Sequence, residues 1–135
     1  QQEMARNVLR SERRRVRDVM IPWERVAKIA PDADARALRG ASPGQAHARY
    51  PVVSADGHLH GIAHLLDLLR PGTPPAARIA RSAYFLRADQ TVLAALLTLQ
   101  RRHAPIAVVR DAGRMVGIVT AKDLVEEIVG DLHDL

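Results

Sequence analysis

The sequence contains no cysteine, very few aromatic residues and no long hydrophobic run. Without cysteine the chain forms neither disulfides nor thiolate metal sites. Aromatic residues make up only 3% of the chain and no groove-reading motif is present, so we expect no nucleic acid among its partners. No apolar run approaches the roughly 18 to 20 residues that a membrane-spanning helix needs.

Catalytic motifs are missing as well. The sequence has no nucleophile elbow, no Walker phosphate loop, no glycine-rich dinucleotide fingerprint and no metalloprotease helix. We therefore predict no catalytic residues and no enzymatic activity. Three histidines, His58, His60 and His64, share one face of a predicted strand, where imidazoles can meet a transition metal. No carboxylate or cysteine clearly completes a ligand shell, so we predict no metal site.

The net charge of +5 raises the question of a negatively charged partner. Five arginines lie between Arg10 and Arg17, whereas other arginines are scattered along predicted helices. Two interpretations of the cluster stay open. Basic residues next to a membrane favour its cytoplasmic side and anionic headgroups, whereas a solvated helix face needs no partner. A nucleic-acid binder would differ from both, since its affinity falls steeply with salt.

The main positive feature of the sequence is an internal repeat. Residues 45–69, moved forward by 56 positions, fall on residues 101–125 without a gap. Each copy of such a repeat is usually one supersecondary unit that cannot bury its apolar face alone. A copy of roughly 60 residues is also marginal in isolation, so we predict one module built from two packed copies. The matching pairs include His47 and His103, Gly57 and Gly113, Gly61 and Gly117, and Asp67 and Asp123.

Both copies have the same predicted order of elements: strand, helix, strand, turn, strand, helix. In the first copy the elements are 25–30, 33–39, 50–53, 59–63 and 65–69. In the second they are 83–87, 91–102, 106–109, 115–119 and 121–129. The hairpin turns are Asp56-Gly57 and Ala112-Gly113. A helix over 2–19 precedes the first copy and ends before Pro22, since proline disfavours helix in the residue before it.

These elements predict an α/β (α+β) fold of two pseudo-symmetric β-α-β-β-α units, whose small sheets pack through helices. The predicted divisions are an N-terminal linker helix, a first repeat, a proline-containing linker and a second repeat. Their bounds are residues 1–15, 16–71, 72–78 and 79–135.

The phrase from Gly117 to Asp123 resembles the signature of the cystathionine-beta-synthase (CBS) domain, which usually occurs as a tandem pair, the Bateman module. The second copy carries the glycine, two apolar residues, threonine, two free positions and aspartate of that signature. The first copy, Gly61 to Asp67, has His64 where the hydroxyl residue stands. The stretches Val16–Met20 with Pro22, Arg49–Val52 and Glu126–Asp131 further resemble the CBS pair of the CorC/HlyC group of hemolysin-like membrane proteins, which are related to the CNNM transporters.

This resemblance implies a regulatory module on the cytoplasmic side of a membrane protein that transports magnesium or another divalent cation. It implies a membrane domain before the pair and a small domain after it, so we expect this chain, which starts Gln-Gln, to be a fragment. It also implies a homodimer. The ligand implied is an adenine nucleotide, AMP, ADP or ATP, possibly with Mg²⁺, bound in the cleft between the repeats.

Thr120 and Asp123 are the residues best suited to hold such a nucleotide. Both lie where a predicted strand gives way to a helix, and three residues apart they reach the same opening. The helix start and a threonine hydroxyl favour a phosphate, and an aspartate suits the two ribose hydroxyls. Ile118 is a candidate to contact the base. The resemblance adds the first copy's Arg49, Tyr50 and Pro51 to this site.

The same spacing has a structural interpretation that stays open. Threonine followed three residues later by an acid is also a capping box, in which both side chains satisfy backbone N–H groups of the helix. The first copy forms a weaker candidate site from His64 and Asp67, because histidine does not reproduce the hydroxyl and Leu66 replaces Lys122. Ile21 also lacks the hydroxyl often found there in the family. The alternative function is therefore a dimerisation and assembly module without nucleotide.

Overall fold

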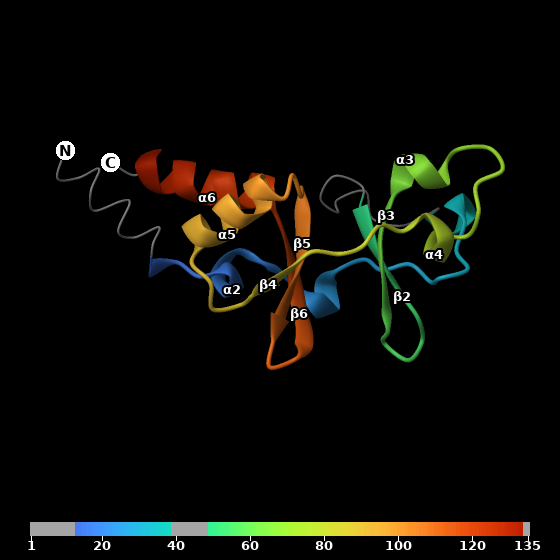
Figure 1. The fold of residues 1–135 in the computed structure, drawn as a ribbon, viewed down its shortest axis with the longest axis horizontal. Coiled ribbons are helices and arrows are strands. Elements are labelled where there is room, and N and C mark those ends of the chain that lie inside the picture. Colours follow the sequence, from blue (N-terminus) through green and yellow to red (C-terminus); the bar gives the residue numbers. More distant parts are fainter. Residues whose placement is uncertain (1–12, 39–48, 134–135) are drawn as a thin grey trace. The chain divides into compact units, whose positions relative to one another are not determined.

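The computed structural model describes residues 13–38 and 49–133, which form two compact units. The terminal unit combines residues 1–25 with 84–135, and the central unit spans 26–83. Figure 1 shows the elements of both. Within the described ranges, no helix combines the length and the apolarity that a membrane crossing requires.

The terminal unit contains a four-stranded sheet in the order β1-β6-β5-β4. β5 and β6 form an antiparallel hairpin, β4 runs parallel to β5, and β1 pairs antiparallel with β6. Ala112 and Gly113 both have positive φ, 50° and 79°, in the predicted hairpin turn. The strands are β1 (Ile21–Pro22), β4 (Phe85–Arg87), β5 (Ile106–Asp111) and β6 (Arg114–Thr120).

Helices cover one face of this sheet and form the main core of the unit. They are α2 (Val16–Val19), α5 (Val92–Arg101) and α6 (Ala121–His133), with the 3-10 helix η1 (Trp23–Arg25) after β1. α5 buries one side at positions three and four apart, Val92, Ala95, Leu96 and Leu99. These side chains share a buried cluster with Val109, Val119 and Leu124. Burial of each large apolar side chain stabilises the fold by roughly 1.5–3 kcal/mol.

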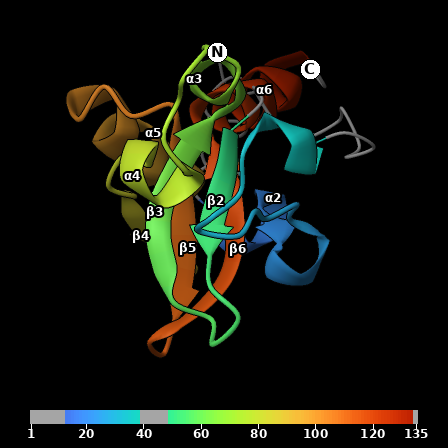
Figure 2. The ribbon, with the colours of Figure 1, turned by 90° about the vertical axis from the view of Figure 1, so that its right-hand side faces the viewer.

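The central unit is built around one antiparallel hairpin of β2 (Arg49–Val53) and β3 (Leu59–His64), drawn in green in Figure 2. Two short helices, α3 (Leu65–Leu68) and α4 (Ala76–Ile79), and the 3-10 helix η2 (Ala35–Leu38) complete it. Tyr50, Val52, Ala63, Leu68 and Ala76 form its buried core. The central unit therefore has a smaller sheet and shorter helices than the terminal unit.

The predicted α/β fold class is confirmed, and every predicted element of the second copy is present. The predicted strand at 25–30 is wrong: only Ile29 pairs, in a single parallel bridge with Val52. Ile29 donates to Pro51 O and accepts from the Val53 amide. The neighbouring ladder bonds would need N–H groups from Pro31 and Pro51, which proline lacks. The predicted helix at 33–39 is the short η2, and residue 39 lies outside the described range.

The predicted helix over 2–19 is also corrected within the described residues. Arg13 is helical, but the helix is interrupted at Arg14 and Arg15, because Arg15 is extended and pairs with Thr91, and α2 covers only Val16–Val19. The Arg15 amide donates to Asp18 Oδ2 at 2.9 Å, which starts α2 at Val16. Residues 1–12, which hold most of the predicted linker helix, lie outside the described range.

The internal repeat extends further than the sequence comparison showed. The Met20 amide donates to Val16 O and the Ala80 amide donates to Ala76 O, so residues 16–20 and 76–80 make the same short helix. The following residue then pairs with a strand, Ile21 with Ile118 and Arg81 with Ile62. Each unit is thus completed by a segment that precedes the other repeat in sequence. The repeat bounds 16–71 and 79–135 stay predictions, since they describe the duplication and not these compact units.

Two equivalent glycines make this pairing possible. A Cβ on Gly117 would lie 2.6 Å from Ile21 O, and one on Gly61 would collide with the carbonyl of Arg81. Gly61 also has a φ of +138°, which L side chains rarely adopt. The glycine of the repeated phrase is therefore required by the close approach of a neighbouring backbone.

Candidate functional site

Thr120 lies at the junction of β6 and α6. Its side chain is 1% exposed, and its Oγ1 accepts a hydrogen bond of 3.0 Å from the amide of Asp123. The threonine therefore caps α6, as the structural interpretation of the sequence predicts. Because the oxygen acts as acceptor in this bond, the hydroxyl hydrogen stays available for donation.

Asp123 completes only half of a capping box. Its amide is satisfied by Thr120, but its carboxylate has no hydrogen-bond or ion-pair partner among the described residues. The side chain is half-buried in the first turn of α6. A carboxylate near a helix N-terminus is electrostatically favoured and accepts hydrogen bonds only. Within the described part of the chain, this acceptor is therefore unpaired at the predicted position.

The amides at the start of α6 are less free than the sequence suggests. The Ala121 amide donates to Pro105 O at 2.9 Å, and the Asp123 amide is bound to Thr120. A phosphate at this helix start would therefore find fewer donors than an uncapped helix offers. Lys122 lies beside this turn; it is exposed, and its ion pair with Glu126 is long, at 3.8 Å.

Ile118 lies on the same face of β6 as Thr120, opposite the face that packs against the helices. Val119 belongs to the helix-covered cluster, whereas Ile118 and Thr120 alternate with it along the strand. β1 pairs Ile21 with Ile118 and Pro22 with Gly117, which brings the front segment of the chain next to the candidate site. Ile118 itself is fully buried.

The other predicted residues of this site, Arg49, Tyr50 and Pro51, lie in β2 of the central unit. Tyr50 is buried in the core of that unit and Pro51 is fully buried, whereas Arg49 is half-buried and pairs in register with His64. Their predicted grouping with Thr120 and Asp123 stays a prediction.

His64 takes the place of Thr120 in the central unit. It is the N-cap residue of α3, and its Nδ1 accepts a hydrogen bond of 3.0 Å from the amide of Leu66. An imidazole nitrogen therefore replaces the hydroxyl oxygen as helix cap, one residue earlier in the helix than in α6. This bond requires an unprotonated Nδ1.

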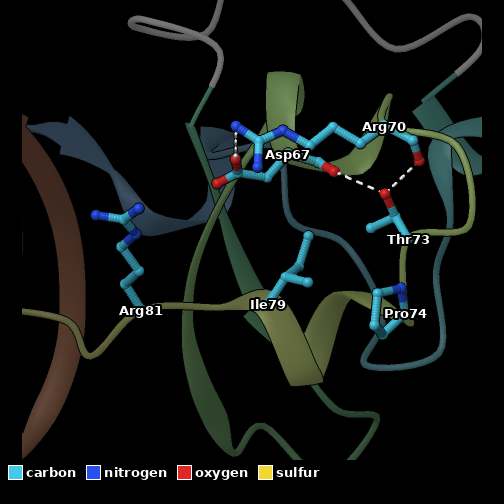
Figure 3. Close-up of a pocket in the computed structure, with 6 residues that line it drawn as sticks. All are labelled: Asp67, Arg70, Thr73, Pro74, Ile79 and Arg81. Carbon is cyan, nitrogen blue, oxygen red and sulfur yellow. Dashed lines mark hydrogen bonds and ion pairs between the residues drawn. The ribbon is translucent and has the colours of Figure 1, made fainter.

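Asp67 lies in a cavity of about 320 Å³. The side chains that line it are drawn in Figure 3: Asp67, Arg70, Thr73, Pro74, Ile79 and Arg81. Asp67 Oδ1 is 3.8 Å from a guanidinium nitrogen of Arg70, and the Thr73 hydroxyl donates to Asp67 O at 3.0 Å. Sequence reasoning found Asp67 but missed Arg70, Thr73 and Arg81, which match no residue of the repeated phrase.

Comparison with known proteins identifies the family of this chain. The CBS domain model matches residues 76–130. The magnesium and cobalt efflux protein CorC of Vibrio cholerae is 32% identical over 98% of this chain. A solved CBS domain of a bacterial CNNM/CorC family Mg²⁺ transporter, in complex with ATP, is 30% identical with a TM-score of 0.81, over 96% of both chains. The chain belongs to the CorC/CNNM family of CBS-domain proteins. The predicted resemblance is thereby confirmed.

This CBS pair spans about half the length of the curated relatives it matches, 48% for the V. cholerae protein and 46% for the CorC of Pasteurella multocida, which is 31% identical. The similarity covers 98% of this chain in both cases. The matched region therefore includes both repeats.

Two histidines and a carboxylate lie near the hairpin turn of the central unit. The rings of His58 and His60 meet edge to face at 4.7 Å, but no group of three potential metal ligands occurs within residues 13–38 and 49–133. In the same turn, a hydrogen bond from the Ser54 hydroxyl, followed by one from the His58 amide, lowers the pKa of Asp56 below its ordinary value.

Part of the basic segment has a structural role. Arg14 forms an ion pair of 2.9 Å with Glu127 of α6, and the Arg15 guanidinium donates to Asp89 O at 3.1 Å. Arg10 lies outside the described range. These contacts fix the start of α2 against the rest of the terminal unit.

Proposed function

We propose that this CBS pair is a non-catalytic regulatory module that binds an adenine nucleotide beside the start of α6. The observation that carries the proposal is the Asp123 carboxylate, which is half-buried at a capped helix start and has no partner among the described residues. A buried acceptor is normally satisfied, and a half-buried carboxylate is satisfied by a ligand or by water. The two hydroxyls of a ribose would satisfy it.

Each nearby residue has a distinct role in this proposal. Thr120 holds the helix start in place and keeps its hydroxyl hydrogen for the ligand. Lys122 is exposed, and its long ion pair with Glu126 leaves its ammonium available for a phosphate. Ile118 supports the site from within the sheet. The contribution of Arg49, Tyr50 and Pro51 rests on family resemblance. The CNNM/CorC neighbour that was solved with ATP supports an adenine nucleotide as the ligand class.

We extend the proposal to the whole protein. Relatives are named as magnesium and cobalt efflux proteins, and the neighbour belongs to an Mg²⁺ transporter. The module would lie on the cytoplasmic side of the membrane, between a membrane domain and a C-terminal domain, and control transport of a divalent cation. Nucleotide binding, with or without Mg²⁺, would shift the module only as far as the nucleotide prefers one arrangement over another.

We also propose that the pair is a homodimer. Val125 and Val129 lie four residues apart on α6 and are 40% and 42% exposed, and Leu97 of α5 is 49% exposed. Apolar side chains exposed on adjacent helices are typical of an interface. Sedimentation equilibrium tests this: a single species of monomer mass at high concentration contradicts it.

A thermal-shift series with Asp123→Asn tests nucleotide binding. The wild type should be stabilised by AMP, ADP or ATP, by about 2.7 kcal/mol when the nucleotide is at 100 times its dissociation constant. Asn keeps the size of the side chain and the amide that Thr120 caps, so the apo melting temperature should fall only slightly, through the lost charge at the helix start, while the nucleotide effect is lost. Trp23, the only tryptophan of the chain, follows β1 in the 3-10 helix η1, which contacts β6, so its fluorescence gives a second readout.

Asp111→Asn is the matched control, because Asp111 is an exposed carboxylate at the far end of the same hairpin. It should respond to nucleotide like the wild type. If no nucleotide moves the melting curve or the Trp23 emission of the wild type, the module serves assembly alone. That outcome is the second candidate function, and the capping role of Thr120 favours it.

A further inference from the structure

The arginine run near the start of the chain is joined, in the terminal unit, by arginines from two strands. The Arg17 amide donates to Ala88 O at 3.0 Å, so the segment that holds α2 lies beside the end of β4. On the next strand, Arg110 of β5 pairs in register with Arg87 of β4. Residues that are far apart in the sequence therefore lie along one edge of this unit.

Asp89 connects the arginines of the run with those of the strands. Its carbonyl oxygen accepts a hydrogen bond of 3.1 Å from the Arg15 guanidinium, and its Oδ1 lies 3.2 Å from Arg87 Nε. Arg110 shares a face of the sheet with Arg87, because residues in register on neighbouring strands point to the same side. Its guanidinium lies over the Phe85 ring, 3.7 Å from the centroid. The exposed arginines of these adjacent segments are called the basic edge: Arg13, Arg15, Arg17, Arg87 and Arg110.

The carboxylates near the basic edge do not cancel its charge. The Asp18 carboxylate accepts from a main-chain amide. The ion pair of Asp89 with Arg87 is weak, because the two side chains are 65% and 77% exposed. Asp111, which follows β5's arginine, lies opposite Arg114 in the hairpin. The basic edge therefore carries more positive than negative charge.

Two members of the basic edge have no structural contact of their own. The guanidinium groups of Arg13 and Arg17 have no hydrogen-bond or ion-pair partner within residues 13–38 and 49–133. Arginine binds phosphate oxygens through paired N–H donors. Beside these charges, Tyr84 and Phe85 are 42% and 39% exposed. Basic residues next to exposed aromatic rings are typical of a protein surface that contacts lipid headgroups.

We propose that the basic edge binds the surface of a membrane that contains anionic lipids. The arginines are attracted by the summed charge of the headgroups, and Tyr84 and Phe85 lie at headgroup level. The choice of a membrane over a nucleic acid rests on the proposed attachment of this module to a transporter. Nucleotide binding at Thr120 and Asp123 is not needed for it. The proposal gives the arginine run a partner, which the sequence alone left open.

The test is sedimentation of the full 135-residue chain with lipid vesicles. Vesicles of phosphatidylcholine and phosphatidylserine, mixed at about three to one, should carry the protein into the pellet, and pure phosphatidylcholine should not. Binding should be lost near 1 M salt, where the Debye length is about 3 Å. The double variant Arg13→Gln with Arg17→Gln should bind about twentyfold more weakly, because each arginine near an anionic surface contributes about fivefold. The double variant Arg87→Gln with Arg110→Gln should show a similar loss, and melting temperatures check that both variants fold.

The double variant Arg101→Gln with Arg102→Gln is the matched control, because it removes the same charge from exposed arginines at the end of α5. Thr91, the N-cap of α5, pairs with Arg15, and the ten residues of the helix extend roughly 15 Å away from that pair. This control should bind anionic vesicles like the wild type. Asp123→Asn should also keep vesicle binding, so failure of the nucleotide proposal and failure of this one are distinguishable.

Three outcomes overturn the proposal. The first is full vesicle affinity in either double variant of the basic edge. The second is an equal loss in the control at the end of α5, which would show that net charge and not the basic edge attracts the vesicles. The third is tighter binding of the basic edge to duplex DNA than to anionic vesicles, which would assign its arginines to a nucleic acid.

Discussion

The two helix starts that follow the repeated phrase both have a side-chain cap, but the capping residue and the surroundings of the aspartate differ. In the terminal unit, Thr120 caps the 13-residue helix α6, and the Asp123 carboxylate has no partner within residues 13–38 and 49–133. In the central unit, His64 caps the four-residue helix α3 and Asp67 lies 3.8 Å from Arg70. The cap is needed for the strand to turn into a helix, so both copies retain one. The partner of the aspartate is not needed for folding, so it differs.

The helix α6 is also more deeply packed than α3. Leu124 of α6 is fully buried in the terminal core, whereas Leu66 of α3 and the following Leu69 are 64% and 56% exposed. Helix stability in proteins comes mainly from packing of the apolar face. We therefore expect α6 to be stable and α3 to be only marginally stable. The comparison therefore predicts that equivalent substitutions have unequal effects in the two units.

The largest losses of unfolding free energy are expected at the two glycines that lie close to a neighbouring backbone. Gly61→Ala places a Cβ against the Arg81 carbonyl at a φ of +138°, so it should cost about 3 kcal/mol of unfolding free energy. Gly117→Ala should cost less, about 2 kcal/mol, because part of its clash is with the flexible Met20 side chain. Urea denaturation measures both.

Gly57→Ala separates the cost of backbone strain at positive φ from the cost of a steric clash with a neighbouring backbone. Gly57 has a φ of +88° but no neighbouring atom within 4 Å, so its substitution reports the cost of positive φ alone. A loss in Gly57→Ala as large as in Gly61→Ala would show that the approach of Arg81 is not what requires glycine there.

Substitution of the two cap residues should give the next largest losses of unfolding free energy. The two losses compare the stability of α6 and α3 directly. Thr120→Ala removes the bond to the Asp123 amide in a buried position and should cost about 1–2 kcal/mol. His64→Ala removes the bond to the Leu66 amide at a shorter, more exposed helix, and should cost about 0.5 kcal/mol. Thr120→Ser keeps the acceptor and should recover most of the loss. Equal losses at both caps would contradict the proposed difference in packing.

The fold was predictable where local signals agreed. The second copy has a clear strand alternation, a helical period from Val92 to Leu99 and a glycine turn at Gly113, and its elements appear where predicted. The first strand of the first copy was not predictable in this way. Its single bridge at Ile29 depends on two prolines in different segments, Pro31 and Pro51, and they act together only once the segments are paired.

The sequence predicted the position of the candidate site but left two roles open for its residues. The spacing of Thr120 and Asp123 fits both a cap and a ligand site. The structure shows that the threonine caps, whereas the aspartate carboxylate has no partner in the part of the chain that the structure describes. The cavity of the central unit could not be predicted, because Arg81 reaches it through a main-chain pairing with Ile62. No sequence motif marks that pairing, although the equivalent pairing of Ile21 with Ile118 repeats it.

The smallest expected effect is the pH dependence of stability at the two hairpin turns, which differ in their charge. In the central unit, the Ser54 hydroxyl and then the His58 amide lower the pKa of Asp56 from its ordinary value of 3.8, whereas the terminal turn has the uncharged Ala112 at the matching position. A lowered pKa in the folded state means that the stabilisation is complete above the unfolded pKa and is lost as the pH falls through the folded one. Between about pH 5 and pH 3, the wild type should therefore lose slightly more stability than Asp56→Asn. Amide exchange at Gly57 and His58 should show the loss, and exchange at Gly113 should not. If both turns open equally as the pH falls, acid sensitivity belongs to the whole module and not to the charged turn of the central unit.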